Sequence, residues 1–480
     1  MVRGGPSRAE SPSPMNLPPS ILAAHEQLSP LSRRFVEFVL EHPETAQKLE
    51  FRQLAADAGM PEWIQTYKYA IQSWPALVGA EKLRQIERAT VGVTRLLRLI
   101  PERVFGHDAR RIAEFYGWNE MMVKLLMLEP PTGLESCVTR GDFIDGGTGL
   151  KCLEVNASAY LGGWQMRFWE ALCRRGPAIS AFLAREGVEP VYRDPWRELF
   201  THLVRRACGR GLDRRGELNV ALVIDPEAEL PPIAGQIVNE VYAEALAAID
   251  EGLAGTVTIC EYREGFKASG CALSYRQLPI DAVIEYTCDL TPREVYRCFK
   301  AGTIELFNGP LSGVLGDKRN LALLSQLEDS DVFTAEERAV VREHIPWSRD
   351  LADGIATHHG ERVDLLQFAL ANRESLIIKS TGGSRGENIY IGRSLSVAEW
   401  EARLRAAIST KGFLLQELVQ SLPYLYQYGD CGHAPHQAVW GMFCMGESYG
   451  GGFLRLMPVE RGPSVINSAR GAREGIIFEV

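Results

Sequence analysis

The chain has 480 residues, of which 46% are hydrophobic and 24% charged, and its formal net charge is −9. This length allows two or three domains around a large core, and the acidic balance argues against nucleic acid as a main partner. No apolar run approaches the ~18 residues that a membrane-spanning helix needs, and the N-terminus lacks the apolar segment of a secretory signal. The ten cysteines are scattered without paired motifs. We therefore expect reduced thiols, a cytoplasmic location and no membrane partner.

The N-terminal part of the chain is predicted to be helical after a short tail. Residues 1–20 are rich in Pro, Ser and Gly, a composition typical of disorder. Residues 21–135 are expected to be mostly helical, with helices over 30–42, 44–58 and 81–100, the last ended by Pro101. The aromatic residues of this region are interpreted as core and not as a ligand site: Trp63, Tyr67, Tyr69 and Trp74.

Residues 138–156 are predicted to form a β-hairpin around a glycine-rich loop at 145–149. A five-residue loop pairs Ile144 with Leu150 and therefore sets Arg140 opposite Glu154. Because side chains alternate between the faces of a strand, four polar residues then share one face: Arg140, Asp142, Glu154 and Asn156. Carboxylate and amide oxygens bind hard metal ions, and an adjacent arginine binds anions. The alternative is an exposed face with a weak cross-strand ion pair.

Residues 191–290 alternate between strand and helix signals. Strands are predicted over 219–225, 256–262 and 282–286, with a helix over 233–252. This order indicates a small α/β unit with a parallel sheet. A GxGxxG motif does not open any helix of this segment, so a dinucleotide site is not expected. A substrate pocket would be built from this unit and from loops such as 421–437.

A second segment with candidate binding residues lies at 375–392, which is predicted to form a strand, a glycine-rich turn and a second strand. The first strand is apolar and carries Lys379. Glycines in the turn free the backbone, so that its N–H groups can point at phosphate oxygens. The turn contains Gly382, Gly383, Ser384, Arg385 and Gly386, and it is not a GxxxxGK[ST] loop. Lys318, just inside another predicted helix, is either a solvated lysine or a second nucleotide-binding cation.

These segments together resemble the circularly permuted ATP-grasp ligases of the glutathionylspermidine synthase type. The resemblance rests on R-x-D-x11-E-x-N at 140–156, on the Lys379 strand with its turn, and on WGxF, GGFxRxxP and VxNxxxG at 440–471. The metal-binding half comes last in the usual ATP-grasp order, whereas here it precedes the phosphate-binding half. The resemblance covers about residues 136–480.

The resemblance implies an α/β (α+β) ATP-grasp fold with a Rossmann-like unit and a helical N-terminal region. The expected parts are a tail at 1–20, a helical region at 21–135, a magnesium-binding half at 136–190, a Rossmann-like substrate-side unit at 191–300 and ATP-binding lobes at 301–480. Two Mg²⁺ ions would be held by Asp142, Glu154 and Asn156. ATP would be bound by Lys318, Lys379, the turn at 382–386, the adenine hinge of Gln416, Glu417, Leu418 and Val419, and by Asn467 and Arg470.

The same resemblance implies the reaction. Arg140 would lie near an acyl-phosphate intermediate, and Arg455 would contact a phosphate or acyl-phosphate group. We expect an ATP-dependent carboxylate–amine ligase that releases ADP and phosphate and acts on small molecules, such as amino acids or peptides. Two alternatives remain open: a phosphotransferase that uses the same nucleotide site, and a nucleotide-binding protein without turnover.

Overall fold

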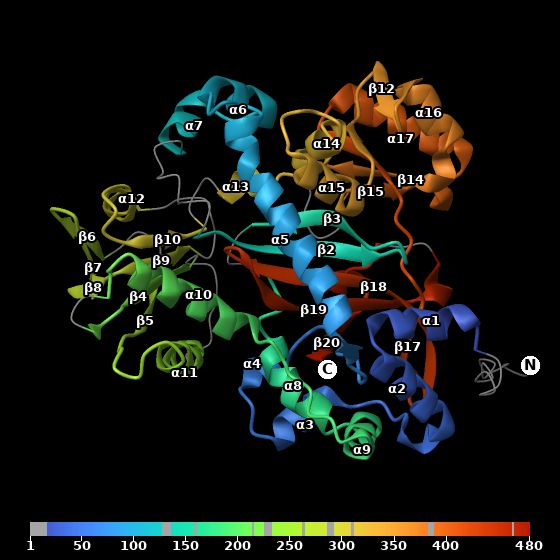
Figure 1. Ribbon diagram of the computed structural model, residues 1–480, viewed down its shortest axis with the longest axis horizontal. Coiled ribbons are helices and arrows are strands. Elements are labelled where there is room, and N and C mark those ends of the chain that lie inside the picture. The colour runs from blue at the N-terminus through green and yellow to red at the C-terminus, as the bar shows by residue number, and fades with distance from the viewer. Residues whose placement is uncertain are drawn as a thin grey trace, which may run out of the picture.

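The computed structural model describes residues 17–126, 136–157, 161–213, 216–224, 233–261, 265–285, 292–308, 312–382, 388–462 and 465–480 (Figure 1). Most of the predicted tail, residues 1–16, lies outside this part. The fold is mixed α/β, as the sequence predicted. Within the described residues, no helix combines the length and the apolar character that crossing a membrane would require.

A seven-stranded sheet forms the centre of the molecule. Its order is β1-β20-β19-β18-β2-β3, with β17 also paired to β18, and all neighbours are antiparallel except β1 and β20. The strands are β1 (Ala76–Val78), β2 (Val138–Asp145), β3 (Leu150–Asn156), β17 (Tyr424–Tyr428), β18 (Gly432–Met445), β19 (Ser448–Pro458) and β20 (Arg473–Glu479). The predicted hairpin is therefore β2–β3, and the C-terminal part of the chain completes its sheet. Segment 421–437, expected to be a loop, contains β17 and the start of β18.

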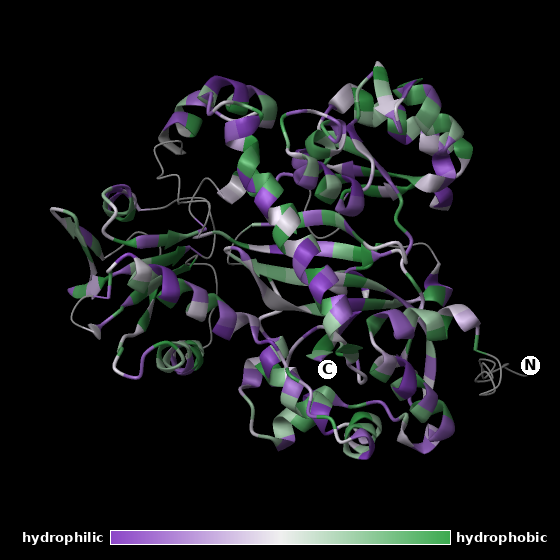
Figure 2. Cartoon of the chain, in the orientation of Figure 1, coloured by the Kyte–Doolittle hydropathy of each residue, from purple (hydrophilic) through white to green (hydrophobic). Residues whose placement is uncertain are grey.

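Helix α5 (Ala80–Arg103) crosses one face of this sheet and contacts β2, β3, β18 and β19 (Figure 1). Hydrophobic and hydrophilic residues alternate along it (Figure 2), and its buried residues include Ile86, Val93 and Leu97. Pro101 was expected to end the helix but lies within it. Only two residues follow it in the helix, so the interruption falls in the last turn. At the other end, Lys82 forms a buried ion pair with Asp145, which joins α5 to the end of β2.

Further helices of the N-terminal region pack below the sheet, together with α8 (Met166–Arg174) and α9 (Pro177–Glu186) (Figure 1). The first of the predicted helices is α2 (Pro30–Glu41), in which Ser29 caps the N-terminus by accepting a hydrogen bond from the Ser32 N–H. The second, predicted over 44–58, is wrong in extent, because a 3-10 turn at Pro43–Thr45 precedes α3 (Phe51–Asp57). The others below the sheet are α1 (Pro19–Leu28) and α4 (Glu62–Gln65), whereas α6 (Ala109–Tyr116) and α7 (Glu120–Leu126) lie above it, beyond the end of α5 (Figure 1).

The predicted small α/β unit is present beside the central sheet. Its parallel sheet has the order β10-β9-β4-β5, formed by β4 (Val220–Ile224), β5 (Val257–Glu261), β9 (Ala282–Glu285) and β10 (Glu305–Phe307). Helices α10 (Pro195–Gly209), α11 (Ala234–Ala247) and α12 (Arg293–Lys300) accompany it, with a small antiparallel sheet of β6 (Phe266–Ser269), β7 (Ala272–Tyr275) and β8 (Leu278–Ile280). Helix α10 runs from this unit toward the central sheet, where it contacts β18 and β19 (Figure 1).

A third sheet has the antiparallel order β11-β16-β14-β15 and carries Lys379. Its strands are β11 (Ser348–Asp350), β14 (Leu376–Ser380), β15 (Ile389–Ile391) and β16 (Phe413–Glu417), and α16 (Leu365–Ala371) and α17 (Val397–Thr410) pack with it. A hairpin of β12 (Ile355–His358) and β13 (Glu361–Asp364) lies at its edge. The two strands predicted within 375–392 are confirmed as β14 and β15, which pair antiparallel. Residues 383–387 of the turn lie outside the described residues.

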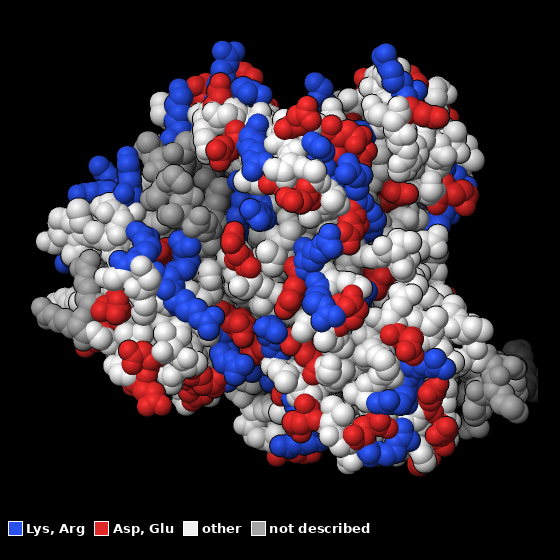
Figure 3. Space-filling model, viewed as in Figure 1, with Lys and Arg blue, Asp and Glu red and all other residues white. Residues whose placement is uncertain are grey.

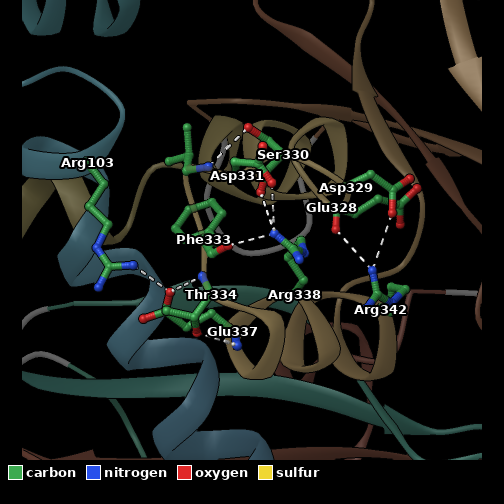
Figure 4. A network of polar contacts seen from close by, with 11 residues as sticks. Arg103, Glu328, Asp329, Ser330, Asp331, Phe333, Thr334, Glu337, Arg338 and Arg342 are labelled. Carbon is green, nitrogen blue, oxygen red and sulfur yellow. Dashed lines mark hydrogen bonds and ion pairs between the residues drawn. The ribbon is translucent and has the colours of Figure 1, made fainter.

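Helices α14 (Arg319–Gln326) and α15 (Ala335–His344) lie between the central and third sheets, and the short α13 (Ser312–Leu315) contacts α5 (Figure 1). Helix α15 begins with a capping box in which Thr334 and Glu337 exchange hydrogen bonds (Figure 4). Glu337 also pairs with Arg103 of α5, at 2.5 Å. Later on the same helix, Arg338 donates to the carbonyl groups of Ser330 and Phe333. These contacts tie α15 to α5 and to the preceding loop.

Candidate functional site

The hairpin β2–β3 brings the four predicted polar residues to one face, but in a different register from the one expected. Asp145 pairs with Leu150, and the register shifts beyond Phe143, so that Asp142 lies opposite Glu154 and Arg140 opposite Asn156. Leu153 is the extra residue of this β-bulge. Without the bulge, Asp142 would oppose Leu153 and Glu154 would point to the other face. The predicted pairing of Arg140 with Glu154 is therefore wrong, while the common face is retained.

Asp142 is held between two arginines. Arg140 places Nε 3.1 Å from Asp142 Oδ1, and Arg455 of β19 places Nη2 2.6 Å from Asp142 Oδ2. The Asp142 carboxyl is buried, which by itself raises its pKa, but the two guanidinium groups together hold the pKa well below its usual range. Asp142 is thus ionised at neutral pH, as a metal ligand must be.

Glu154 and Asn156 complete the polar face. Glu154 Oε2 lies 3.3 Å from Nζ of Lys318, which directly precedes α14. This contact places Lys318 beside the hairpin, as expected for a residue of the site, although Lys318 does not line either cavity described below. Asn156 is half-buried, and its side-chain amide donates to the Arg140 carbonyl at 3.5 Å.

Lys379 on β14 is buried and faces the same hairpin. Its Nζ donates to Gln416 Oε1 at 2.6 Å and to the Leu153 carbonyl of the bulge at 3.4 Å. Burial lowers the pKa of Lys379 to about 8, a shift that Lys318 reinforces and Glu154 opposes. Gln416, the first residue of the predicted adenine hinge, lines the first cavity, and its amide nitrogen also donates to Ser348 Oγ at 2.9 Å. It positions the Lys379 ammonium.

A first cavity, with about 920 Å³ of empty volume, lies between the hairpin and the third sheet. Its polar residues include Asp142, Glu154, Lys379 and Arg455, and the predicted hinge 416–419 forms one side. Apolar residues, among them Ile144, Ile377 and Val439, form the walls. The N–H groups of Glu417 and Leu418 already donate to the carbonyls of Trp347 and Ser375. An adenine edge would therefore be read by the remaining polar groups of this segment.

A second cavity, with about 1870 Å³ of empty volume, lies on the other side of the Asp142–Arg455 pair. Arg455 and Asn467 line both cavities, whereas Arg140 lines only the second. Trp63, Tyr67 and Tyr69 also line it, so their interpretation as core alone is wrong; Trp74 is core, with 2% of its surface exposed. Aromatic residues have the same sequence pattern whether they pack on protein or face a cavity, and this explains the error.

The remaining predicted residues have mixed placements. Asn467 lines both cavities, but its side-chain oxygen accepts a hydrogen bond from the Ala469 N–H at 2.8 Å and caps a short 3-10 turn. Arg470 is exposed and lines neither cavity. Gly382 is the last described residue of the turn that was predicted to bind phosphate. Gly383, Ser384, Arg385 and Gly386 lie outside the described residues, so their predicted roles stay predictions.

The polar face suits a magnesium ion in its chemistry. Two carboxylates and an amide offer oxygen ligands, and the side chain of Asp142 is held ionised. Three cationic side chains now compensate these carboxylates: Arg140 and Arg455 contact Asp142, and Lys318 contacts Glu154. A metal ion at Asp142 would therefore share the carboxylate with the arginines or displace one of them.

The chain is similar to the solved structure of a glutathione synthetase-like effector from Globodera pallida in its apo form. The TM-score is 0.52, with 10% sequence identity over 92% of this chain and 97% of that chain. At this identity the likeness shows a related fold alone. No family model and no curated protein sequence matches the chain.

Proposed function

We propose that the protein is an ADP-forming carboxylate–amine ligase of the circularly permuted ATP-grasp type, with ATP and Mg²⁺ bound in the first cavity. The observation that carries this proposal is that two cavities meet at the ion pair of Asp142 and Arg455. One cavity offers a buried lysine, two carboxylates and an apolar slot, which suit a nucleotide triphosphate with its metal ions. The other offers arginine and apolar side chains, which suit an organic acid. Phosphoryl transfer between the two requires such a shared boundary.

The permuted order is supported by the chain itself. The hairpin with Asp142 and Glu154 precedes the strand with Lys379 by more than two hundred positions, and both line the first cavity. A glutathione synthetase-like fold is compatible with this assignment.

The reaction proceeds in two steps in this proposal. A carboxylate oxygen of the substrate attacks the γ-phosphorus of ATP, and the bond from this phosphorus to the β-phosphate oxygen breaks. ADP departs, and the substrate is now an acyl phosphate. The lone pair of an amine then attacks the acyl carbon, and phosphate leaves as the amide forms and the amine loses its proton. Lys379 binds phosphate oxygens, and Arg140 and Arg455 stabilise the negative charge that develops on the acyl group. Mg²⁺ on Asp142, Glu154 and Asn156 would neutralise phosphate charge.

The nucleotide product tests the proposed step. With ATP, Mg²⁺ and a panel of carboxylic acids and amines, we expect ADP and phosphate to form only when an acid is present. Chromatographic separation of ADP from AMP makes the measurement. AMP and pyrophosphate as products would contradict transfer of the γ-phosphoryl group, and a phosphorylated product that survives amine addition would indicate a phosphotransferase.

The affinity for ATP should depend on pH through Lys379. In the free protein the pKa of this lysine is lowered to about 8 by burial. Below pH 8 the ammonium is already charged and ATP binding needs no proton. Above pH 8 a proton must be taken up on binding, so affinity should fall by up to about tenfold per pH unit. Calorimetric titrations from pH 7 to 9.5 would measure this. A Lys379→Met variant should lack this dependence; if the variant keeps it, another group is responsible.

A further inference from the structure

We propose that the second cavity binds an organic acid with an apolar, aromatic-sized body, whose carboxylate faces Arg140 and Arg455. The inference rests on the proposed function, because it takes this carboxylate as the group that accepts the phosphoryl group. It goes beyond that function by naming the chemical class of the acid. Polar acids and peptides are the competing class of ligand for this cavity.

The inner end of the cavity selects a negative group. Arg140 is directed there by a hydrogen bond from Nη1 to the Gly162 carbonyl, at 3.3 Å, and its guanidinium lies over the Phe453 ring. Arg455 is only 7% exposed, and its buried Nε lacks a hydrogen-bond acceptor within the described structure. A buried cationic donor without an acceptor is costly, so it points to a ligand oxygen at the boundary that Arg455 forms between the two cavities.

Glu474, the acidic residue that lines the second cavity, already has hydrogen-bond donors within the protein. Glu474 accepts hydrogen bonds from Tyr67 at 2.8 Å and from Gln165 at 3.0 Å on one oxygen, and from Ser468 at 2.7 Å on the other. Burial, followed by the neighbouring Glu474 charge, raises the pKa of Tyr67, so its phenol stays neutral. The Glu474 carboxylate is therefore stabilised within the protein and does not require a cationic group on the ligand. When Asp142, which contacts both arginines, is counted with Glu474, the three described cations Arg140, Arg455 and Lys68 still outnumber the two acids.

The rest of the cavity is apolar and comes from three parts of the chain. The N-terminal region contributes Trp63, and helix α10 contributes Trp196. The parallel sheet contributes Ile224 and Ile284 at the carboxyl ends of β4 and β9, with Ile237 of α11 also in the lining. Ligands of open parallel sheets bind outside the carboxyl ends of the strands. A polar peptide would leave its hydrogen-bonding groups facing these side chains, whereas an aryl or long alkyl group buries apolar surface against them.

Calorimetric binding of phenylalkanoates, from phenylacetate to 5-phenylpentanoate, tests the inference. Affinity should rise by roughly fourfold per added methylene. At least tenfold weaker binding is expected for 3-phenylpropanamide, which lacks the charge, and for glutarate, which lacks the apolar body. Ile237→Asp should weaken 3-phenylpropanoate by at least tenfold, while Gln236→Asp, an equal charge change at an exposed position on α11, should not. If Ile237→Asp does not fold, Trp63→Leu replaces it, with the same weakening expected.

Glutarate binding as tightly as the phenylalkanoates, or equal effects of the Ile237 and Gln236 substitutions, would overturn the inference. The same mixtures with ATP, Mg²⁺ and hydroxylamine as the amine separate it from the proposed function. Tight phenylalkanoate binding without ADP would overturn the ligase and leave the ligand class standing. ADP formed with glutarate but not with phenylalkanoates would support the ligase and overturn the ligand class.

Discussion

Replacing Glu154 by glutamine should abolish turnover while leaving the fold intact. The amide keeps the shape of the side chain but removes the negative charge that a metal ion on the hairpin requires. We expect turnover to fall ~1000-fold, which corresponds to roughly 4 kcal/mol of transition-state stabilisation, with little rescue by excess Mg²⁺. The free energy of unfolding should change by less than about 0.5 kcal/mol, because the pair with Lys318 is partly exposed.

Glu343→Gln is the matched control. Glu343 also contacts a cation, Arg88, at 3.4 Å and lies next to His344, whose ring contacts the Leu150 carbonyl of β3. It lines neither the first nor the second cavity. Removing its charge should leave turnover unchanged. Wild-type turnover of Glu154→Gln with a demonstrated substrate would show that the hairpin does not hold the metal.

The second large effect is expected at Lys379. Its ammonium is fixed by Gln416 and by the Leu153 carbonyl, and it faces the first cavity. Lys379→Met should weaken ATP binding at pH 7 by roughly 2–3 kcal/mol, which is about 30- to 150-fold, because a charge-assisted contact is lost. Lys318→Met should have a smaller effect, since Lys318 does not line that cavity. Isothermal titration of both variants with ATP makes the comparison.

Lys151→Met controls for the loss of a positive charge near the hairpin. Lys151 is on β3, but its ammonium donates to the Arg342 carbonyl at 2.9 Å and does not line the first cavity. ATP affinity of this variant should match the wild type. An unchanged ATP affinity in Lys379→Met would show that the nucleotide binds elsewhere on the protein.

The elements that carry the candidate site were predictable because their signals are local. Apolar residues around Lys379 and the glycines after it indicate a strand and a turn, and the structure has β14 and β15 there. The hairpin β2–β3 was predicted by alternation and by the glycines of its loop. Its register was not, since the bulge at Leu153 has no distinctive residue. The bulge is instead favoured by contacts from elsewhere, such as the bond from Lys379 to the Leu153 carbonyl.

Features that depend on contacts between distant parts of the chain could not be predicted from the sequence. The pair of Asp142 and Arg455 joins two strands of one sheet, β2 and β19, that are both neighbours of β18. Two guanidinium groups on one buried carboxylate follow from that sheet order, which single-sequence patterns do not give. The same holds for the second cavity, where Trp63 and Ile237 come together from regions that the sequence presents only as helical.

The fate of the substrate oxygen tests the central claim most directly. A carboxylic acid labelled with ¹⁸O in both oxygens would be turned over with ATP and amine, and the released phosphate analysed by mass spectrometry. Because a carboxylate oxygen attacks the γ-phosphorus and leaves with phosphate when the amine attacks the acyl carbon, each phosphate should carry one ¹⁸O atom. Unlabelled phosphate, with both ¹⁸O atoms retained in the organic product, would contradict the acyl-phosphate mechanism.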